Sequence, residues 1–323
     1  MGAPAFVSLH GKRFGLGPNG PVFEGRTVGS WPIGMGRGKT FYVDSSVAGT
    51  DGKSPQTAVA SIDTAIGYCT ANQGDVIVVM PKHTETVVAA GGIACDVAGI
   101  SIIGLGYGNQ RPTITFGTAT TATVTVSAAG VFIQNLIFSS NLLNVAVGID
   151  ITAADCWIDS CSFKNAGSSK NFISPIKITS TTANAGDGLR VMNCRWTCNG
   201  DTAGGPMISI AGNCNSAVIW NNFMNSAATA TAQLVSVASG KLLTDADIGW
   251  NRCLNLMTAN ELFISNDGTT NTGIIHNNYV GHADVTGTHD AGWDAGGFRL
   301  FNNLSVSVDN LSGFPLPAID VNL

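Results

Sequence analysis

The sequence predicts an all-β solenoid, in which short parallel strands are wound into coils that stack on one another. The first observation is a phrase of an apolar residue, any residue and Asn, which recurs along residues 131–306. Its spacing drifts between 25 and 33 residues, which is typical of a solenoid with loops of variable length. The second observation is that each unit holds short alternating apolar runs, such as Val131-Phe-Ile133, and no helical heptads. One such coil cannot bury its inner face alone, so neighbouring coils are expected to stack.

The third observation is that Asn keeps its place in the phrase. The third position holds Asn in six units and Ser160 in the seventh. Asn suits a tight corner with left-handed backbone, and stacked Asn side chains can hydrogen-bond from coil to coil. The alternative is that Asn is merely common in loops. The repeated register favours a structural ladder along one corner, made of Asn135, Asn193, Asn221, Asn251, Asn277 and Asn302.

The segment that opens the coils carries a second pattern, made of Phe41-Tyr-Val-Asp44, Asp51-Gly-Lys-Ser-Pro55 and Gly74-Asp-Val-Ile-Val-Val79. With the repeated phrase, these motifs resemble right-handed parallel β-helix proteins of the pectate-lyase-like superfamily. The resemblance covers about residues 41–306 and implies a right-handed parallel β-helix that begins with a short capping helix. Met80-Pro-Lys-His-Thr-Glu85 departs from the family's usual Pro-Gly-Thr-Tyr. This departure is similar to β-helix virion structural proteins of tailed bacteriophages.

The chain divides into four parts by composition. We expect an extended Gly-rich basic arm at 1–40, an opening segment with a capping helix at 41–81, the parallel β-helix at 82–306, and a C-terminal cap or crossover at 307–323. The capping helix is expected over about residues 62–72, because Ser61 can cap it and apolar residues then recur on one face. That face would close the open apolar end of the solenoid.

The predicted arm is basic while the remainder is acidic. Five cations face only Glu24 in residues 1–40, which gives +4; the chain carries −5, so the remainder carries −9. A Gly-rich segment with spaced aromatic and cationic residues favours an arm that orders on a partner, although an inert tail is the alternative. The expected anchors are Phe6, Phe14, Phe23, Trp31, Arg13, Arg26 and Arg37.

Composition limits the compartment and the partners. Charged residues make up only 11% of the chain, which fits coils that bury much of their length and subunits that cover each other's flanks. No run of 18 apolar residues exists and the first ten residues lack a signal-peptide pattern, so we expect no membrane partner. The eight cysteines favour reduced core residues and folding in a reducing cytoplasm. Disulfides, or a metal at Cys194 and Cys198, are the alternatives.

Three clusters of charged residues are candidate catalytic sites. They are Asp187 with Arg190 and Arg195; Asp245 with Asp247; and His282, Asp284, His289, Asp290 and Asp294. A glycan hydrolase would place carboxylates a fixed distance apart, and a lyase would combine calcium-binding acids with a base. None of the clusters repeats at a constant offset on adjacent coils, so solvated loop acids are the favoured interpretation. We therefore expect no catalytic residues, no metal and no cofactor.

These observations favour a structural protein of a tailed-phage virion, a homotrimeric capsid decoration protein anchored by its arm. The expected partners are the major capsid protein or another virion protein, and not nucleic acid; the expected location is the virion, assembled in the host cytoplasm. The alternative is a tail spike, or a glycan-binding or depolymerase protein acting on a host surface glycan. Outward-facing aromatics would favour glycan binding, but the sequence does not assign Trp157, Trp220, Trp250 or Trp293 to a face.

Overall fold

The structure of the protein is a computed structural model. It describes part of the chain in full and some strands by their backbone alone. The fully described ranges are 38–167, 169–179, 186–198, 205–226, 234–255, 264–266, 270–282 and 296–307, apart from a few strand-end side chains. Strand backbones are also described for 6–9, 12–17, 20–23, 26–27 and 310–315.

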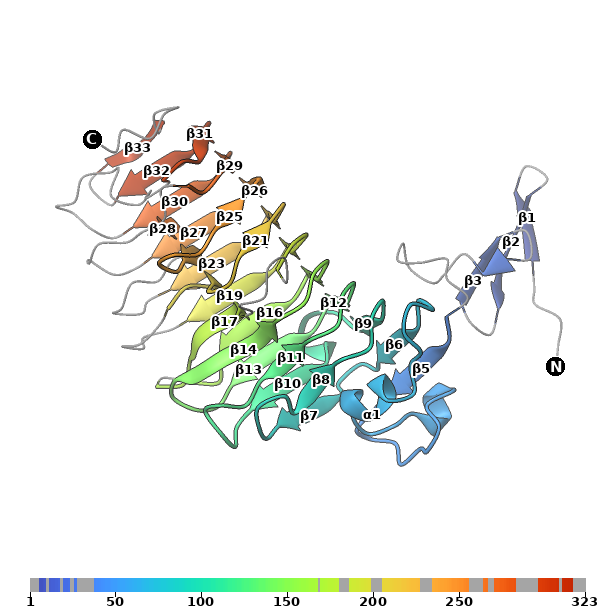
Figure 1. Ribbon diagram of the computed structural model, residues 1–323. Helices are drawn as coiled ribbons and strands as arrows, with labels where there is room; N and C mark the ends of the chain where they lie inside the picture. Colours follow the sequence, from blue (N-terminus) through green and yellow to red (C-terminus); the bar gives the residue numbers. More distant parts are fainter. Residues whose placement is uncertain are drawn as a thin grey trace.

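The body is a right-handed parallel β-helix, which confirms the predicted fold (Figure 1). Sheet 1 consists of β5 (Thr40–Val43), β6 (Val76–Val79), β9 (Ser101–Gly104), β12 (Phe132–Gln134), β15 (Trp157–Asp159), β18 (Arg190–Met192), β22 (Val218–Trp220), β26 (Ala246–Gly249), β29 (Gly273–His276) and β31 (Arg299–Phe301).

Two further sheets complete each coil, in the order sheet 3, sheet 1, sheet 2 along the chain. Sheet 2 consists of β7 (Thr84–Val87), β10 (Thr113–Phe116), β13 (Ile137–Ser140), β16 (Ser162–Asn165), β19 (Arg195–Cys198), β23 (Phe223–Ser226), β27 (Arg252–Asn255), β30 (Tyr279–His282), β32 (Leu304–Ser307) and β33 (Asn310–Pro315). Sheet 3 consists of β8 (Ile93–Cys95), β11 (Val124–Val126), β14 (Val145–Ile151), β17 (Phe172–Ile178), β20 (Ile208–Ile210), β24 (Val235–Val237) and β28 (Ile264–Asn266). A short parallel pair, β21 (Cys214–Asn215) and β25 (Leu243–Thr244), lies between sheets 3 and 1.

The core is built from equivalent side chains stacked along the coils. In sheet 1 the inward column is aliphatic: Ile133 pairs with Ile102 on one side and with Ile158 on the other. In sheet 2 the inward column is aromatic over three successive coils, at Phe138, Phe163 and Trp196, and the rings of Phe138 and Phe163 stack with centroids 5.0 Å apart. Because successive residues of a strand point to opposite faces, one apolar residue in two is enough to fill the interior.

The N-terminal end of the β-helix is closed by α1 (Ile62–Ile66) together with the short 3-10 turn η1 (Pro55–Thr57); a second turn, η2 (Gly108–Gln110), follows β9. Ser61 caps α1 through its side chain, and Ile62, Ala65 and Ile66 are buried. The helix is shorter than the predicted range 62–72: its last residue is Ile66, and Gly67 is its C-cap. The closed end contrasts with the exposed edge that an uncapped solenoid would present.

The first 27 residues contain paired strands, which the sequence did not predict. Four strands form an antiparallel sheet: β1 (Phe6–Leu9), β2 (Lys12–Gly17), β3 (Gly20–Phe23) and β4 (Arg26–Thr27). Gly17 pairs with Gly20, so β2 and β3 are joined by a two-residue connection that glycines favour. The predicted extended arm is therefore a small sheet over these ranges. The predicted boundary at residue 40 also falls inside β5.

The C-terminal end of sheet 2 changes direction. β33 pairs with β32 in antiparallel register, whereas the strands from β7 to β32 in this sheet are parallel. Residues 310–315 therefore add a terminal strand to their own chain's sheet, within the segment predicted as a cap or crossover.

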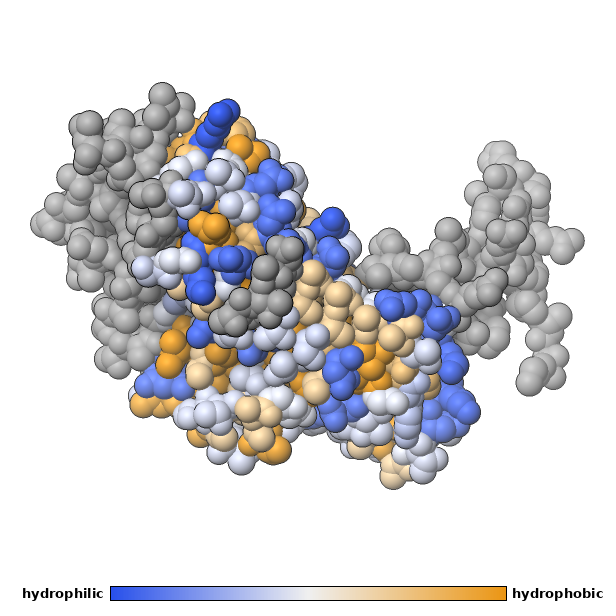
Figure 2. Space-filling model, viewed as in Figure 1, coloured by the Kyte–Doolittle hydropathy of each residue, from blue (hydrophilic) through white to orange (hydrophobic). Residues whose placement is uncertain are grey.

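The surface is weakly polar, in keeping with the low content of charged residues. On the face seen in Figure 2, strongly hydrophilic residues gather near β5 and α1, while the middle of the body is mostly weakly polar or apolar. Among the described residues, no helix has the length and apolar character needed to cross a lipid bilayer.

All eight cysteines are free thiols, and seven of them are buried. Burial raises the pKa of the Cys156 and Cys214 thiols to about 12, which keeps them protonated and unreactive. Within the described part of the chain, no group of His, Cys, Asp or Glu is arranged to hold a metal ion.

Candidate binding surface

The corner between sheets 1 and 2 is a column of left-handed residues. Its φ angles lie between 53° and 60°, and its members are Asn135, Ser160, Asn193, Asn221, Trp250, Asn277 and Asn302. We call this column the asparagine corner. Side chains join neighbouring coils along it, since Asn221 Nδ2 donates to Asn193 Oδ1 at 2.7 Å and Asn302 donates to Asn277.

The structure corrects the predicted ladder at Asn251. The register pairs Ile219 with Ile248 and Trp220 with Gly249, so Trp250 is the residue equivalent to Asn221. Asn251 therefore lies one position later than the other five predicted ladder residues. The phrase was assigned one residue too late in this coil, because Gly249 was taken for the apolar position that Ile248 occupies.

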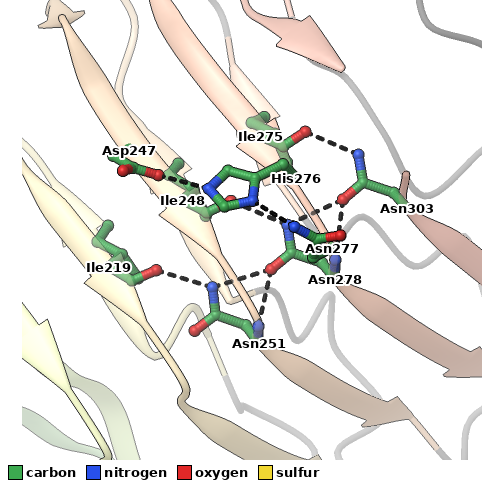
Figure 3. Close-up of polar contacts among 9 residues, drawn as sticks. All are labelled: Ile219, Asp247, Ile248, Asn251, Ile275, His276, Asn277, Asn278 and Asn303. Atoms are coloured by element: carbon green, nitrogen blue, oxygen red, sulfur yellow. Dashed lines mark hydrogen bonds and ion pairs between the residues drawn. The ribbon is translucent and has the colours of Figure 1, made fainter. Parts of the chain in front are cut away.

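Asn251 belongs instead to a second, fully buried ladder (Figure 3). Its members directly follow the asparagine corner in four successive coils: Asn222, Asn251, Asn278 and Asn303. Each Oδ1 from Asn251 onward accepts the backbone N–H of the preceding member, with N···O distances of 2.8–3.0 Å. Each Nδ2 donates to an Ile or Val carbonyl of the previous coil at 2.8–2.9 Å. The inner ladder thus satisfies the backbone groups that the tight corner leaves without partners.

Cysteines occupy the same position in the two coils before Asn222. The thiol of Cys161 donates to the Ile133 carbonyl, with 3.8 Å between sulfur and oxygen, and that of Cys194 donates to the Ile158 carbonyl at 3.6 Å. Cys194 N–H in turn donates to Asn222 Oδ1 at 2.9 Å. The thiols therefore continue the inner ladder as weaker donors. The sequence carried a signal for it in the Asn-Asn pairs at 221–222, 277–278 and 302–303.

The outer face of sheet 1 is rich in aromatic residues. Trp157 and Trp220 alternate with inward residues and so face outward, whereas Trp196 lies in the core with 0% exposure. Near the N-terminal end, Val76, Ile103 and Phe132 form a separate buried cluster on this outer face, against which Trp157 packs. Towards the C-terminal end the face is more open. Trp250 is 55% exposed and Phe301 44% exposed.

His276 organises the open part of this face. Its Nε2 lies 2.8 Å from Asp247 Oδ1, and its Nδ1 lies 2.8 Å from Asn277 Nδ2 (Figure 3). Since the amide nitrogen of Asn277 is a donor, this network places the ring proton on Nε2, where it is donated to Asp247. The ring stacks on Phe301 with an interplanar angle of 5° and meets Trp220 edge-on. Both ring nitrogens are hydrogen-bonded, so this network fixes the ring of His276 against Phe301 and Trp220.

Sheet 2 contributes a column of alternating arginine and aromatic residues just past the asparagine corner. Register places Arg195, Phe223, Arg252 and Tyr279 on successive strands. The Arg195 guanidinium carbon lies 4.8 Å from the centroid of the Phe223 ring, and that of Arg252 lies 5.9 Å from the Tyr279 ring. Stacking on aromatic rings orients a guanidinium while leaving its N–H groups free. Neither Arg195 nor Arg252 forms a salt bridge with any described residue.

The corner between sheets 3 and 1 carries carboxylates instead. We call it the acidic corner; its acids are Asp96, Asp155, Asp187 and Asp245. Asp187 Oδ1 accepts the Asn215 backbone N–H at 2.9 Å, and Asp245 Oδ2 accepts from the Ser216 hydroxyl at 3.1 Å. These acids therefore shape turns. The two acids occupy different positions of their coils, since Asp245 aligns with Ser216 and Asp187 aligns with Asn215.

The first two predicted clusters are not brought together as catalytic sites. Arg190 lies over the ring of Trp157 on sheet 1, while Arg195 lies on sheet 2, and neither forms a salt bridge with Asp187 among the described residues. Asp247 bonds to His276 rather than joining Asp245. In the third cluster, Asp284, His289, Asp290 and Asp294 lie outside the described residues, as does the side chain of His282.

The predicted arm anchors cannot be placed as a site. The backbones of Phe6, Phe14, Phe23, Arg13 and Arg26 lie on strands β1–β4, but their side chains are outside the described part of the structure, as are Trp31 and Arg37 entirely. The described surface therefore consists of aromatic and arginine side chains beside the asparagine corner, with carboxylates on the opposite edge of sheet 1. Exposed aromatic and arginine side chains of this kind are common at binding surfaces.

Comparison with known proteins adds one similarity of fold. No protein-family model matches the chain, and no curated protein sequence matches it significantly. A solved structure described as a "Rhamnogalacturonan lyase" is similar to it, with a TM-score of 0.45 and 10% sequence identity. The match covers 76% of this chain and 69% of that chain. At this identity the similarity concerns the fold alone.

Proposed function

We propose that the protein is a non-enzymatic structural protein of a tailed-phage virion, a trimeric capsid decoration protein that attaches through its N-terminal segment. The observation that carries this proposal is the division of the chain into two differently built parts. Strands β1–β4 pair with one another, and none of the described pairings joins them to the β-helix. The similarity of the opening segment to tailed-phage β-helix proteins supports the choice of a virion.

Charge supports attachment through this segment. Residues 1–40 carry +4 while the remainder carries −9, so an acidic capsid exterior would repel the body and attract the N-terminal segment. One such segment would bind weakly, because ordering it costs conformational entropy. Three segments on one trimer would bind together with much higher avidity.

The roles of the carboxylates support a non-enzymatic protein. Asp187 and Asp245 hold turns of the acidic corner, and Asp247 holds His276. A glycan hydrolase instead needs two free carboxyl groups facing a common cleft, about 5–10 Å apart.

The test is deletion of residues 1–37, which leaves β5 and the Lys39 N–H bond to Asp75 intact. The truncated protein is expected to stay folded but to lose binding to particles of the phage that encodes it. Binding of the intact chain should weaken as ionic strength rises. Two triple variants that lose the same charge are then compared. One replaces Arg13, Arg26 and Arg37 of the N-terminal segment by Gln; the control replaces Lys53, Lys164 and Lys177 of the body by Gln. Only the arginine variant should lose binding; normal decoration by the truncated body would contradict the proposal.

A second candidate function is glycan binding by a tail spike, because Trp220, Trp250 and Phe301 face outward on one surface. Aromatic rings in such an array can stack on sugar rings. The discriminating assay is incubation with polysaccharide from the host surface. Retention of the polysaccharide that is abolished by Trp250→Asn would favour this function, and release of unsaturated or reducing ends would establish a depolymerase.

A further inference from the structure

Carboxylates gather at one corner of sheet 1 and arginines at the other, while Arg190, stacked on Trp157, and Arg299 begin strands on the acidic side. The acidic corner bounds it on one side, and the asparagine corner with Arg195 and Arg252 bounds it on the other. These charges lack salt-bridge partners within the described residues. Unpaired acids and arginines on opposite edges of one face are complementary between two copies of the same chain.

The charges also match in height along the β-helix. Asp187 lies just before β18, and Arg195 begins β19 of the same coil. Two coils later, Asp245 lies just before β26, and Arg252 begins β27. Each acid therefore has an arginine at its own level, across the width of sheet 1.

Exposed apolar residues also lie at matching heights on the two corners that bound sheet 1. Trp250, 55% exposed, stands on the asparagine corner, and Leu242, 37% exposed, stands beside the acidic corner of the same coil. Between them, the open part of the outer face carries half-buried apolar side chains: Met192, Val218, Trp220 and Ile274. Large exposed apolar residues at matching heights mark a contact surface rather than a solvated one.

We infer that the open outer face of sheet 1 is the contact face of a threefold-symmetric trimer, in which Arg195 and Arg252 of each copy pair with Asp187 and Asp245 of the next. A threefold axis parallel to the β-helix keeps equal coils at equal height. With sheet 1 towards the axis, the asparagine corner of one copy meets the acidic corner of its neighbour, and this head-to-tail contact closes into a ring. Trp250 would then pack near Leu242 of the next copy. This inference deepens the proposed function, since it supplies the trimer on which avidity rests.

The test is the mass of the full chain in solution, measured by light scattering after size exclusion. The wild type is expected at about three times 33.2 kDa. In the double variant Arg195→Asp with Arg252→Asp, the protein concentration needed to keep the trimer assembled should rise by more than about tenfold. Asp187→Asn with Asp245→Asn keeps an acceptor for the turn hydrogen bonds but removes both charges, and should weaken the trimer in the same way. Lys53→Asp with Lys177→Asp removes two cations elsewhere and should leave the mass unchanged.

A second variant guards against effects on folding. Trp250 has a φ of 60°, which Asn tolerates better than Trp, so Trp250→Asn should keep or raise the melting temperature while weakening the trimer. A wild-type monomer that binds an acidic polysaccharide through Trp250 would overturn the inference. So would a trimer that the double arginine variant leaves intact. A trimer that dissociates as expected but never binds phage particles would uphold this interface and contradict the proposed function instead.

Discussion

Replacing Asn251 by Leu tests how strongly the inner ladder holds the coils together. Asn251 is 0% exposed, and its side chain makes four hydrogen bonds. Its Oδ1 accepts from the Asn222 backbone N–H at 2.9 Å and from Asn222 Nδ2 at 3.0 Å. Its Nδ2 donates to the Ile219 carbonyl at 2.8 Å and to Asn278 Oδ1 at 3.0 Å. Leu has a similar shape, so the lost bonds dominate the effect of the change.

One backbone group is left without a partner by this change. Asn222 Nδ2 keeps its bond to the Val191 carbonyl, and Asn278 Oδ1 keeps the Asn251 N–H. The Asn222 N–H and the Ile219 carbonyl lose their bonds to the Asn251 side chain. The Ile219 carbonyl keeps its place in the parallel ladder of β22 with β26, so only the Asn222 N–H is left without a partner. A buried polar group without a partner costs about 1–3 kcal/mol, so the free energy of unfolding should fall by about that amount.

The assay is urea unfolding followed by tryptophan fluorescence, which the buried Trp196 makes sensitive to the core. The matched control is Asn221→Leu, which changes the exposed residue at the corner of the preceding coil. Its side chain donates to Asn193 Oδ1, and its φ of 53° should cost Leu about 1–2 kcal/mol. If Asn251→Leu lost no more stability than Asn221→Leu, the inner ladder would not carry the role assigned to it.

Two further predictions concern His276 and the buried thiols. Gly249→Ala would place a Cβ 2.7 Å from the His276 ring, which should displace His276 from Asp247 and lower the free energy of unfolding by about 1–3 kcal/mol. The control Gly167→Ala, with open space around it, should leave stability unchanged. Equal melting temperatures of the two variants would contradict this packing. The pKa of the Cys156 and Cys214 thiols is raised by burial to about 12, so their stabilisation is complete below about pH 9 and is lost as the pH rises towards 12. Between pH 8 and pH 10 the free energy of unfolding measured in urea should fall by about 1.4 kcal/mol in total for each thiol, because the unfolded thiols ionise only as the pH passes about 9. The variant with both thiols replaced by Ala should show a smaller decrease.

The repeat predicted the coils because it records a physical requirement. One inward apolar residue, Ile or Val in most coils, is needed per strand of sheet 1, and a left-handed residue follows at the corner of most coils. The prediction slipped by one residue at Asn251, since Trp250 occupies a left-handed position that Trp rarely adopts. Anchoring the phrase on the inward residue Ile248 would have restored the register, and with it the buried ladder.

Other features depended on contacts between distant residues. The pairing of β1–β4 was missed because a Gly-rich segment shows little alternation of apolar and polar residues. The outward direction of Trp157 and Trp220 follows from their place beside inward Ile158 and Ile219, and so was available from the register. The matching heights of Asp187 and Arg195 became visible only when strands were assigned to corners and sheets.

The most direct test of the proposed virion role is an image reconstruction of intact tailed-phage particles from the source of this chain. The account predicts β-helix trimers bound on the capsid lattice, with sheet 1 of each copy towards the threefold axis and the N-terminal segments between the trimer and the capsid surface. Absence of the protein from the particle, or its presence only at the tip of the tail, would contradict the account.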